Sequence, residues 1–98
     1  MPLHVLILRA DLHLPTCQSL KAKRSVVTPI IRHLDQLAAV AAAEVEYNDK
    51  WQRTAIGVTA VGNGVSHLEA TMDTVERYLW SRPDIEVLEL VRWWGDED

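Results

Sequence analysis

The chain has 98 residues, of which 48 % are apolar and 24 % are charged, with a formal net charge of −4. This balance excludes a disordered chain and allows one core, so we expect one domain over residues 1–98, with an acidic tail at 95–98. The lone cysteine, the absence of an apolar run near the about 20 residues of a membrane helix and the absence of a signal-peptide pattern predict a cytoplasmic protein that enters no membrane.

The first strand is expected at residues 3–14, where apolar and polar residues alternate, and Pro15 ends it. Its inward face holds Leu6, Leu8, Ala10, Leu12 and Leu14. Ser19 is the expected N-cap of a helix that reaches about Ala38. Because the apolar stripe continues past Pro29, we expect one kinked helix rather than a second helix capped by Thr28. That stripe is Leu20, Val27, Ile30 or Ile31, Leu34 and Leu37.

Two further strands are expected at residues 40–47 and 52–61, joined as a hairpin by turn residues. In the first of them, one side holds Ala41, Ala43, Val45 and Tyr47, and the other holds Glu44 and Glu46. After Gly62-Asn63-Gly64, Ser66 and Glu69 form a capping box that opens a second helix, whose buried stripe is Leu68, Met72, Val75 and Leu79. In the last strand, residues 85–94, the alternation slips between Val87 and Leu88, which indicates a bulge.

The order β-α-β-β-α-β predicts an α+β, ferredoxin-like βαββαβ sandwich. Right-handed crossovers place both helices on one face of a four-stranded antiparallel sheet of order 4-1-3-2. The start of the first helix and the hairpin then lie at one end of the domain, and the N-terminus, the Gly-Asn-Gly loop and the acidic tail lie at the other. On the open face of the sheet we expect two carboxylates and several small residues, namely Glu44, Glu46, Ala42, Ala55 and Gly57.

A basic segment opens the first helix, because four bases and no acid lie between Gln18 and Leu34. A helix N-terminus attracts anions, and the hairpin brings further cations and a tryptophan to the same end. The candidate anion- or nucleic-acid-binding residues are Ser19, Lys21, Lys23, Arg24, Lys50, Trp51 and Arg53. The competing interpretation is a solvated first turn of the helix and a tryptophan that packs on its own hairpin.

Other reactive residue types form no legible site. The histidines show no ligand spacing, so we expect no metal, and Gly62-Asn63-Gly64 lacks the third glycine of a dinucleotide fingerprint, so we expect no cofactor. Cys17 precedes a helix with lysines nearby, but no histidine or aspartate partner is legible for it. The sequence therefore does not predict an enzyme.

Several motifs resemble the YlxP-like family, a bacterial family of unknown function. They are His13-Leu14-Pro15, Ser19-Leu20-Lys21 with Lys23-Arg24-Ser25, Ala43-Glu44-Val45 and Trp51-Gln52-Arg53. The resemblance implies the ferredoxin-like fold and a link to translation, because the genes of members often lie beside those of translation and ribosome-maturation factors. Relatives often carry Glu where Ala22 stands, and Pro29 is also a departure from the family pattern.

Three functions are compatible with these observations. The leading hypothesis is a non-enzymatic accessory protein that binds RNA or the ribosome. The second is a protein-interaction module or homodimer that uses the open sheet face. The third is a binder of a small phosphorylated ligand at the start of the first helix.

Overall fold

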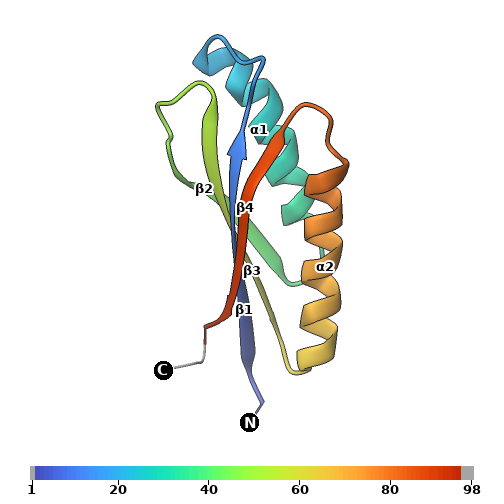
Figure 1. Cartoon of the computed structure of the whole chain (residues 1–98). Helices are drawn as coiled ribbons and strands as arrows, with labels where there is room; N and C mark the ends of the chain where they lie inside the picture. The colour runs from blue at the N-terminus through green and yellow to red at the C-terminus, as the bar shows by residue number, and fades with distance from the viewer. Residues whose placement is uncertain (1, 96–98) are drawn as a thin grey trace.

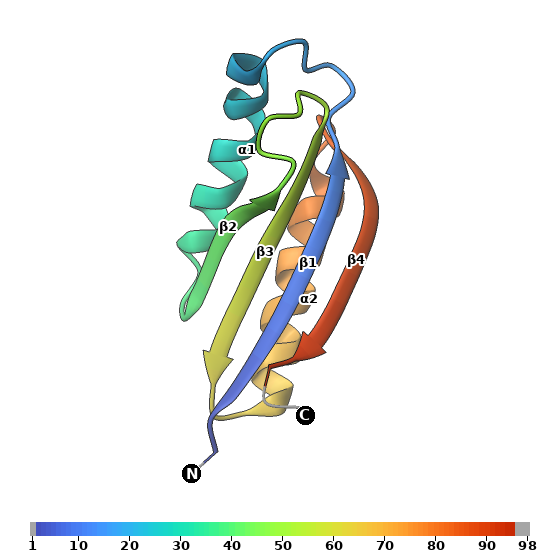
Figure 2. The ribbon, with the colours of Figure 1, turned by 90° about the vertical axis from the view of Figure 1, so that its left-hand side faces the viewer.

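The computed structural model describes residues 2–95, so Asp96, Glu97 and Asp98 of the expected acidic tail lie outside the described residues. The sheet is antiparallel with the order β2-β3-β1-β4, and both helices cover one of its faces (Figures 1 and 2). The elements are β1 (His4–His13), α1 (Leu20–Asp35), β2 (Val40–Glu46), β3 (Arg53–Gly62), α2 (Val65–Ser81) and β4 (Glu86–Trp94). The expected βαββαβ arrangement and strand order are confirmed.

β1 is a central strand, paired with β3 from His4↔Gly62 to His13↔Arg53 and with β4 on its other side. Its alternate residues are buried as expected, and Leu8, Ala10 and Leu12 have no exposed area. The pairing with β4 shifts between Asp11 and Leu12, which confirms the bulge expected near Val87. The alternation follows from the two-residue period of a strand, and Asp11 on the open face is buried as well.

α1 is one helix that continues through Pro29, and its N-cap Ser19 accepts a hydrogen bond at Oγ from the Ala22 backbone N–H at 3.0 Å. Its buried residues are Lys23, Val27, Ile30 and Leu34. The expectation that Leu20 begins the buried stripe is wrong, because this side chain is 37 % exposed. Buried positions four, three and four residues apart place Lys23, rather than Leu20, on the inner face of the helix. The helix ends at Asp35, before the expected Ala38.

In β2, the side chains of Ala42 and Glu44 lie on the other side of the sheet from the one expected. Ala42 packs on the core and Glu44 contacts α1, so both lie on the helix side rather than on the open face. The register with β3 shifts between Glu44 and Glu46. This bulge returns Glu46 to the open face, where it meets Arg9. The alternation of inward and outward residues before a bulge therefore does not predict which way the residues after it point.

The capping box expected for α2 does not form. The helix begins at Val65 with Gly64 at the N-cap, and no side chain caps it. The Leu68 backbone N–H already bonds to the Gly64 carbonyl at 3.1 Å, so Ser66 lies inside the first turn. The expected buried stripe of α2 is confirmed, with 0–1 % exposure at Leu68, Met72, Val75 and Leu79. Within residues 2–95, no helix combines the length and the hydropathy that a membrane span requires.

Candidate functional site

The end of β1, the start of α1 and the β2–β3 loop meet at one end of the domain, at the top of Figure 1. We call this the α1 end and define it as residues 14–25 and 47–53. The Leu14 backbone N–H donates to the Gln52 carbonyl at 2.9 Å, and Gln52 Nε2 donates to the Cys17 carbonyl at 3.2 Å. The two segments that carry the sequence motifs are therefore in direct contact, as the topology predicted.

Lys23 lies on the inner side of the α1 end. It is 2 % exposed, and its Nζ lies 2.9 Å from Glu44 Oε2 and donates to the Tyr47 carbonyl at 2.5 Å. Glu44 also accepts a hydrogen bond from Thr54 Oγ1 at 2.6 Å. A buried ammonium is tolerated when it is paired and hydrogen-bonded in this way. Lys23 thus ties α1 to β2 and to the following loop, and its charge does not face solvent.

The carbonyl that accepts from Lys23 belongs to a residue with a left-handed backbone. Tyr47 has a φ of 64°, a conformation that is costly for a bulky residue. The same carbonyl accepts the Lys50 backbone N–H at 3.0 Å, and the guanidinium of Arg53 lies 4.5 Å from the centre of the Tyr47 ring. These three contacts hold the turn that presents residues 48–52.

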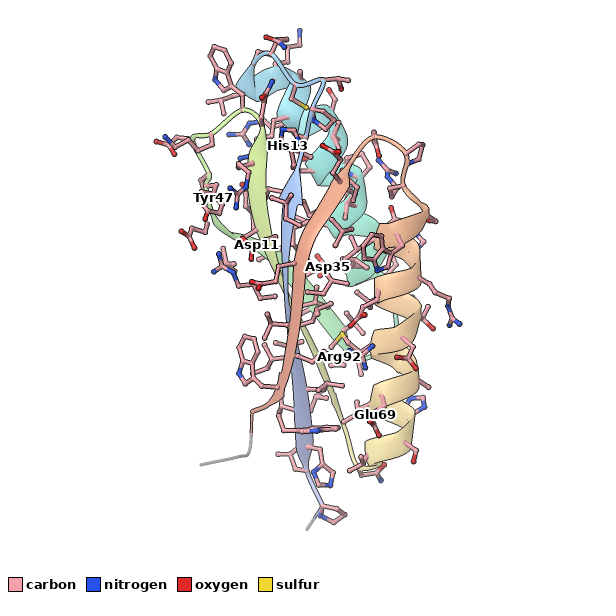
Figure 3. All side chains as sticks on the ribbon, viewed as in Figure 1. Asp11, His13, Asp35, Tyr47, Glu69 and Arg92 are labelled. Atoms are coloured by element: carbon pink, nitrogen blue, oxygen red, sulfur yellow. The ribbon has the colours of Figure 1, made fainter. Side chains whose placement is uncertain are left out.

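Arg53 is also engaged within the domain. Its Nη2 lies 3.6 Å from Asp11 Oδ1, and Asp11 is only 8 % exposed. Arg9 completes the group, with its Nε 2.9 Å from Asp11 Oδ2 and its Nη2 2.6 Å from Glu46 Oε1. These two hydrogen bonds raise the pKa of Arg9 above its usual range. Figure 3 shows Asp11, His13 and Tyr47 in the upper half of the sheet, toward the α1 end.

The remaining candidates lie on the outer side. Lys21, Arg24 and Lys50 are exposed, and within residues 2–95 their side chains take part in no ion pair or hydrogen bond. Trp51 is 52 % exposed, at a hollow of about 400 Å³ that residues 49–53 line. Arg24 borders a cleft of about 190 Å³ between α1 and β2, whose polar lining includes the paired Lys23 and Glu44. The seven candidates thus separate into the inner Lys23 and Arg53, the capping Ser19 and an exposed set of four, Lys21, Arg24, Lys50 and Trp51.

The other reactive groups have identifiable surroundings. Cys17 is buried, and burial together with the nearby Asp84 raises the pKa of its thiol, against a smaller opposite effect of Lys23. His13 Nδ1 lies 2.5 Å from Glu86 Oε1, and the ring of His33 stacks on Tyr78. In the part of the chain that the structure describes, no group of three His, Cys, Asp or Glu side chains is placed to hold a metal ion.

Sequence reasoning missed a hollow of about 430 Å³ on the open sheet face. It extends from β2 across β3 and β1 to Trp93 on β4, and its lining includes Ile7, Ala41, Ala43, Val45, Gly57 and Trp93. Val45 Cγ1 lies 2.9 Å from where a Cβ on Gly57 would be, so only glycine leaves room for that side chain. Trp93 is 45 % exposed, whereas Trp94 is half-buried against the core. The alternation of Ala41, Ala43 and Val45 was the available signal, but the expected open-face position of Glu44 placed these residues on the opposite, helix-covered side, which is wrong.

Comparison with known proteins identifies relatives and a similar fold. A family model described as "Protein of unknown function (DUF503)" matches residues 5–92. "Uncharacterized protein YlxP" of Bacillus subtilis (strain 168) is 35 % identical over 68 residues, which are 69 % of this chain and 74 % of that protein. The solved structure "De novo designed protein Foldit4" has a TM-score of 0.53 and 13 % identity, covering 93 % of this chain and 96 % of that one, which is a likeness of fold alone. The resemblance expected from the motifs is confirmed, and the chain belongs to the YlxP-like family of proteins of unknown function, DUF503.

Proposed function

We propose that this chain is a non-enzymatic, cytoplasmic RNA-binding protein that acts as an accessory factor in translation or ribosome maturation. Single-stranded RNA would bind at the α1 end through Lys21, Arg24, Lys50 and Trp51. The observation that carries the proposal is the exposed set itself: three cations that have no partner within residues 2–95 lie at the same end of the domain as a half-exposed indole. The link to translation rests on the family resemblance alone.

The distribution of partners among the cations supports this location. Arg9, Arg53, Arg82 and Arg92 are each within 4.0 Å of a carboxylate of the same chain. Along α1, by contrast, no acid precedes Asp35, and Lys21 and Arg24 lie in its first turns. Cations at a helix N-terminus oppose the helix dipole, so they gain stability there only when an anion is bound. Phosphates are the anions that such a set of Lys and Arg side chains recognises in RNA.

Trp51 favours a nucleic acid over a small phosphorylated ligand. Bases stack on exposed aromatic side chains, and each stack contributes roughly 1–3 kcal/mol. The cleft beside Arg24 is only about 190 Å³, and its lysine is already paired with Glu44. The exposed cations are instead spread along the end of the domain, on α1 and on the β2–β3 loop. A chain of phosphates with stacked bases fits this spacing better than one compact ligand does.

The open sheet face suits RNA less well. Its two arginines, Arg9 and Arg53, are engaged with Asp11 and Glu46, so their charges are neutralised where they lie. The common RNA-recognition fold uses that face because its central strands carry exposed aromatic residues. Here the central strands carry Arg9, Asp11 and Gly57 at the middle of that face.

Fluorescence anisotropy of a short, labelled single-stranded RNA of mixed sequence, at several KCl concentrations, tests the proposal. The double variant Lys21→Ala/Arg24→Ala should bind more weakly, and its log–log salt slope should fall by up to about 1.4, at about 0.7 per lost phosphate contact. The matched control Arg32→Ala/Arg77→Ala removes two exposed cations elsewhere and should keep the slope. Equal effects of both variants, or no RNA binding by the wild-type chain at low salt, contradict the proposal.

A further inference from the structure

The open face of the sheet, which is turned toward the viewer in Figure 2, has two halves of different chemistry. Toward the N-terminus, cross-strand neighbours such as Ile7, Thr59 and Trp93 form an apolar half. Toward the α1 end, Arg9, Asp11, Glu46 and Arg53 form a charged half, whose groups are largely paired with one another. On this open face, the large apolar side chains of Val45, Val61 and Trp93 are 44–54 % exposed. Single exposed apolar residues are ordinary, but a cluster on one face marks a contact surface.

The apolar half carries both a hollow and a side chain of the size to enter it. The hollow of about 430 Å³ reaches across the sheet, and its floor over β2 and β3 consists of small residues such as Ala41, Ala43 and Gly57. Trp93 stands on β4, at the opposite edge of the sheet, where it forms the far wall of the same hollow. By register, Trp93 pairs with Ile7, Ile7 pairs with Thr59, and Thr59 pairs with Ala41, so Trp93 and Ala41 lie at the same level along the strands.

We propose that a second copy of this chain covers the open face, sheet against sheet, with Trp93 of each copy seated in the hollow of the other. A two-fold axis that runs along the strands in the plane of the interface gives this arrangement. This rotation leaves the position of each residue along the strand direction unchanged and exchanges the two edges of the sheet. Trp93 of one copy therefore comes to lie over Ala41 of the other. One surface patch then meets itself, as a closed two-fold dimer requires.

The division of the face into halves selects this axis. A two-fold axis across the strands would place the apolar half of one copy on the charged half of the other, and Arg9 and Asp11 would lose water without gaining polar partners. The axis along the strands instead places apolar on apolar and charged on charged. It also brings Glu89 of one copy to the level of Glu46 of the other, because both align with Asp11 and Ala55. We therefore expect association to strengthen with salt, which screens this repulsion.

The size of the face is sufficient for a weak dimer. Four strands about 4.8 Å apart, with a rise of about 3.3 Å per residue, make a face of about 600 Å² per copy. Two copies then bury about 1,200 Å² in total, at the lower end of specific interfaces. The inference does not depend on RNA binding. The axis along the strands places the two α1 ends, which we propose bind RNA, at the same end of the dimer.

Sedimentation velocity of the full chain across a range of protein concentrations, at low and high salt, tests the dimer. We expect a concentration-dependent dimer whose Kd rises about tenfold or more in Trp93→Ala. The control Trp80→Ala removes a tryptophan that is 64 % exposed on α2 and should leave the Kd unchanged. Ala43→Arg, which fills the hollow from β2, should also separate the copies, and it decides the question if Trp93→Ala does not fold by circular dichroism.

The proposal is overturned if the wild-type chain is a monomer at all concentrations, since the face then serves another protein or an apolar ligand. It is also overturned by a dimer that Ala43→Arg leaves intact, since the contact then lies elsewhere on the chain. A dimer that forms in the absence of RNA, and that strengthens with salt while RNA binding weakens, separates this inference from the proposed RNA-binding function.

Discussion

The inner and outer sides of the first turns of α1 carry the same residue types and yet have different roles. Lys23 on the inner side is buried and ion-paired with Glu44, whereas Lys21 and Arg24 on the outer side are exposed and without partners in the described chain. All three belong to one short basic motif. Which side of the helix a cation occupies therefore decides whether it holds the fold together or is available to a ligand.

The largest expected difference between the two sides is in stability. Lys23→Ala should lower the free energy of unfolding by about 3–5 kcal/mol, because it leaves the partly buried carboxylate of Glu44 without its counter-charge. Lys21→Ala, two residues away on the solvent side, should change it by less than about 0.5 kcal/mol. Urea denaturation of both variants measures this, and similar losses in the two would refute the distinction between the sides.

The apolar positions of α1 sharpen the same comparison. Leu34→Ala should cost about 2–4 kcal/mol, because Leu34 has no exposed area and its removal leaves a cavity. Leu20→Ala should cost under about 1 kcal/mol, since Leu20 is 37 % exposed. Thermal or urea unfolding of this matched pair tests whether the inner face of α1 begins at Lys23. A larger loss of unfolding free energy for Leu20→Ala than for Leu34→Ala would contradict this and would support the prediction that Leu20 begins the buried stripe.

On the outer side, Trp51 should act through stacking rather than charge. Trp51→Ala should weaken single-stranded RNA binding by roughly 1–3 kcal/mol, a loss of about 5- to 150-fold, with the salt slope nearly unchanged. Trp80→Ala provides the control for loss of an exposed tryptophan on another element. If the anisotropy titrations give wild-type affinity for Trp51→Ala, the indole has no part in the proposed contact.

The smallest expected effect concerns Cys17, a buried residue of the α1 end. Its thiol has a pKa raised by burial above the ordinary value of 9.0, so the unfolded chain loses this proton at a lower pH than the folded chain does. The contribution of Cys17 to stability is therefore complete below pH 9 and falls as the pH rises above it. Chemical denaturation between pH 8 and 10 should show this decline, and it should be smaller in Cys17→Ala. A thiol reagent should also modify the folded chain slowly.

Much of the fold followed from the sequence because strand and helix periodicities are local. Alternation in β1 and helical spacing in α2 identified most of the core, and the crossover rules then gave the strand order. The capping box predicted for α2 was wrong. Ser66 and Glu69 have the spacing of a capping box, but the helix begins two residues earlier, with Gly64 as its N-cap. The contact between the α1 start and the β2–β3 loop was foreseen, since topology alone brings those segments to one end.

The sequence by itself determined which residues alternate, where the chain turns and where positive charge collects. Only the tertiary structure decided that Lys23 is buried, that Glu44 faces α1 and that the small residues of β2 line a hollow on the open face. Each of these outcomes depends on a partner distant in sequence, or on a bulge that exchanges the two faces of a strand. Local periodicity gives the spacing of side chains, but the direction in which they point is fixed by the element that packs against them.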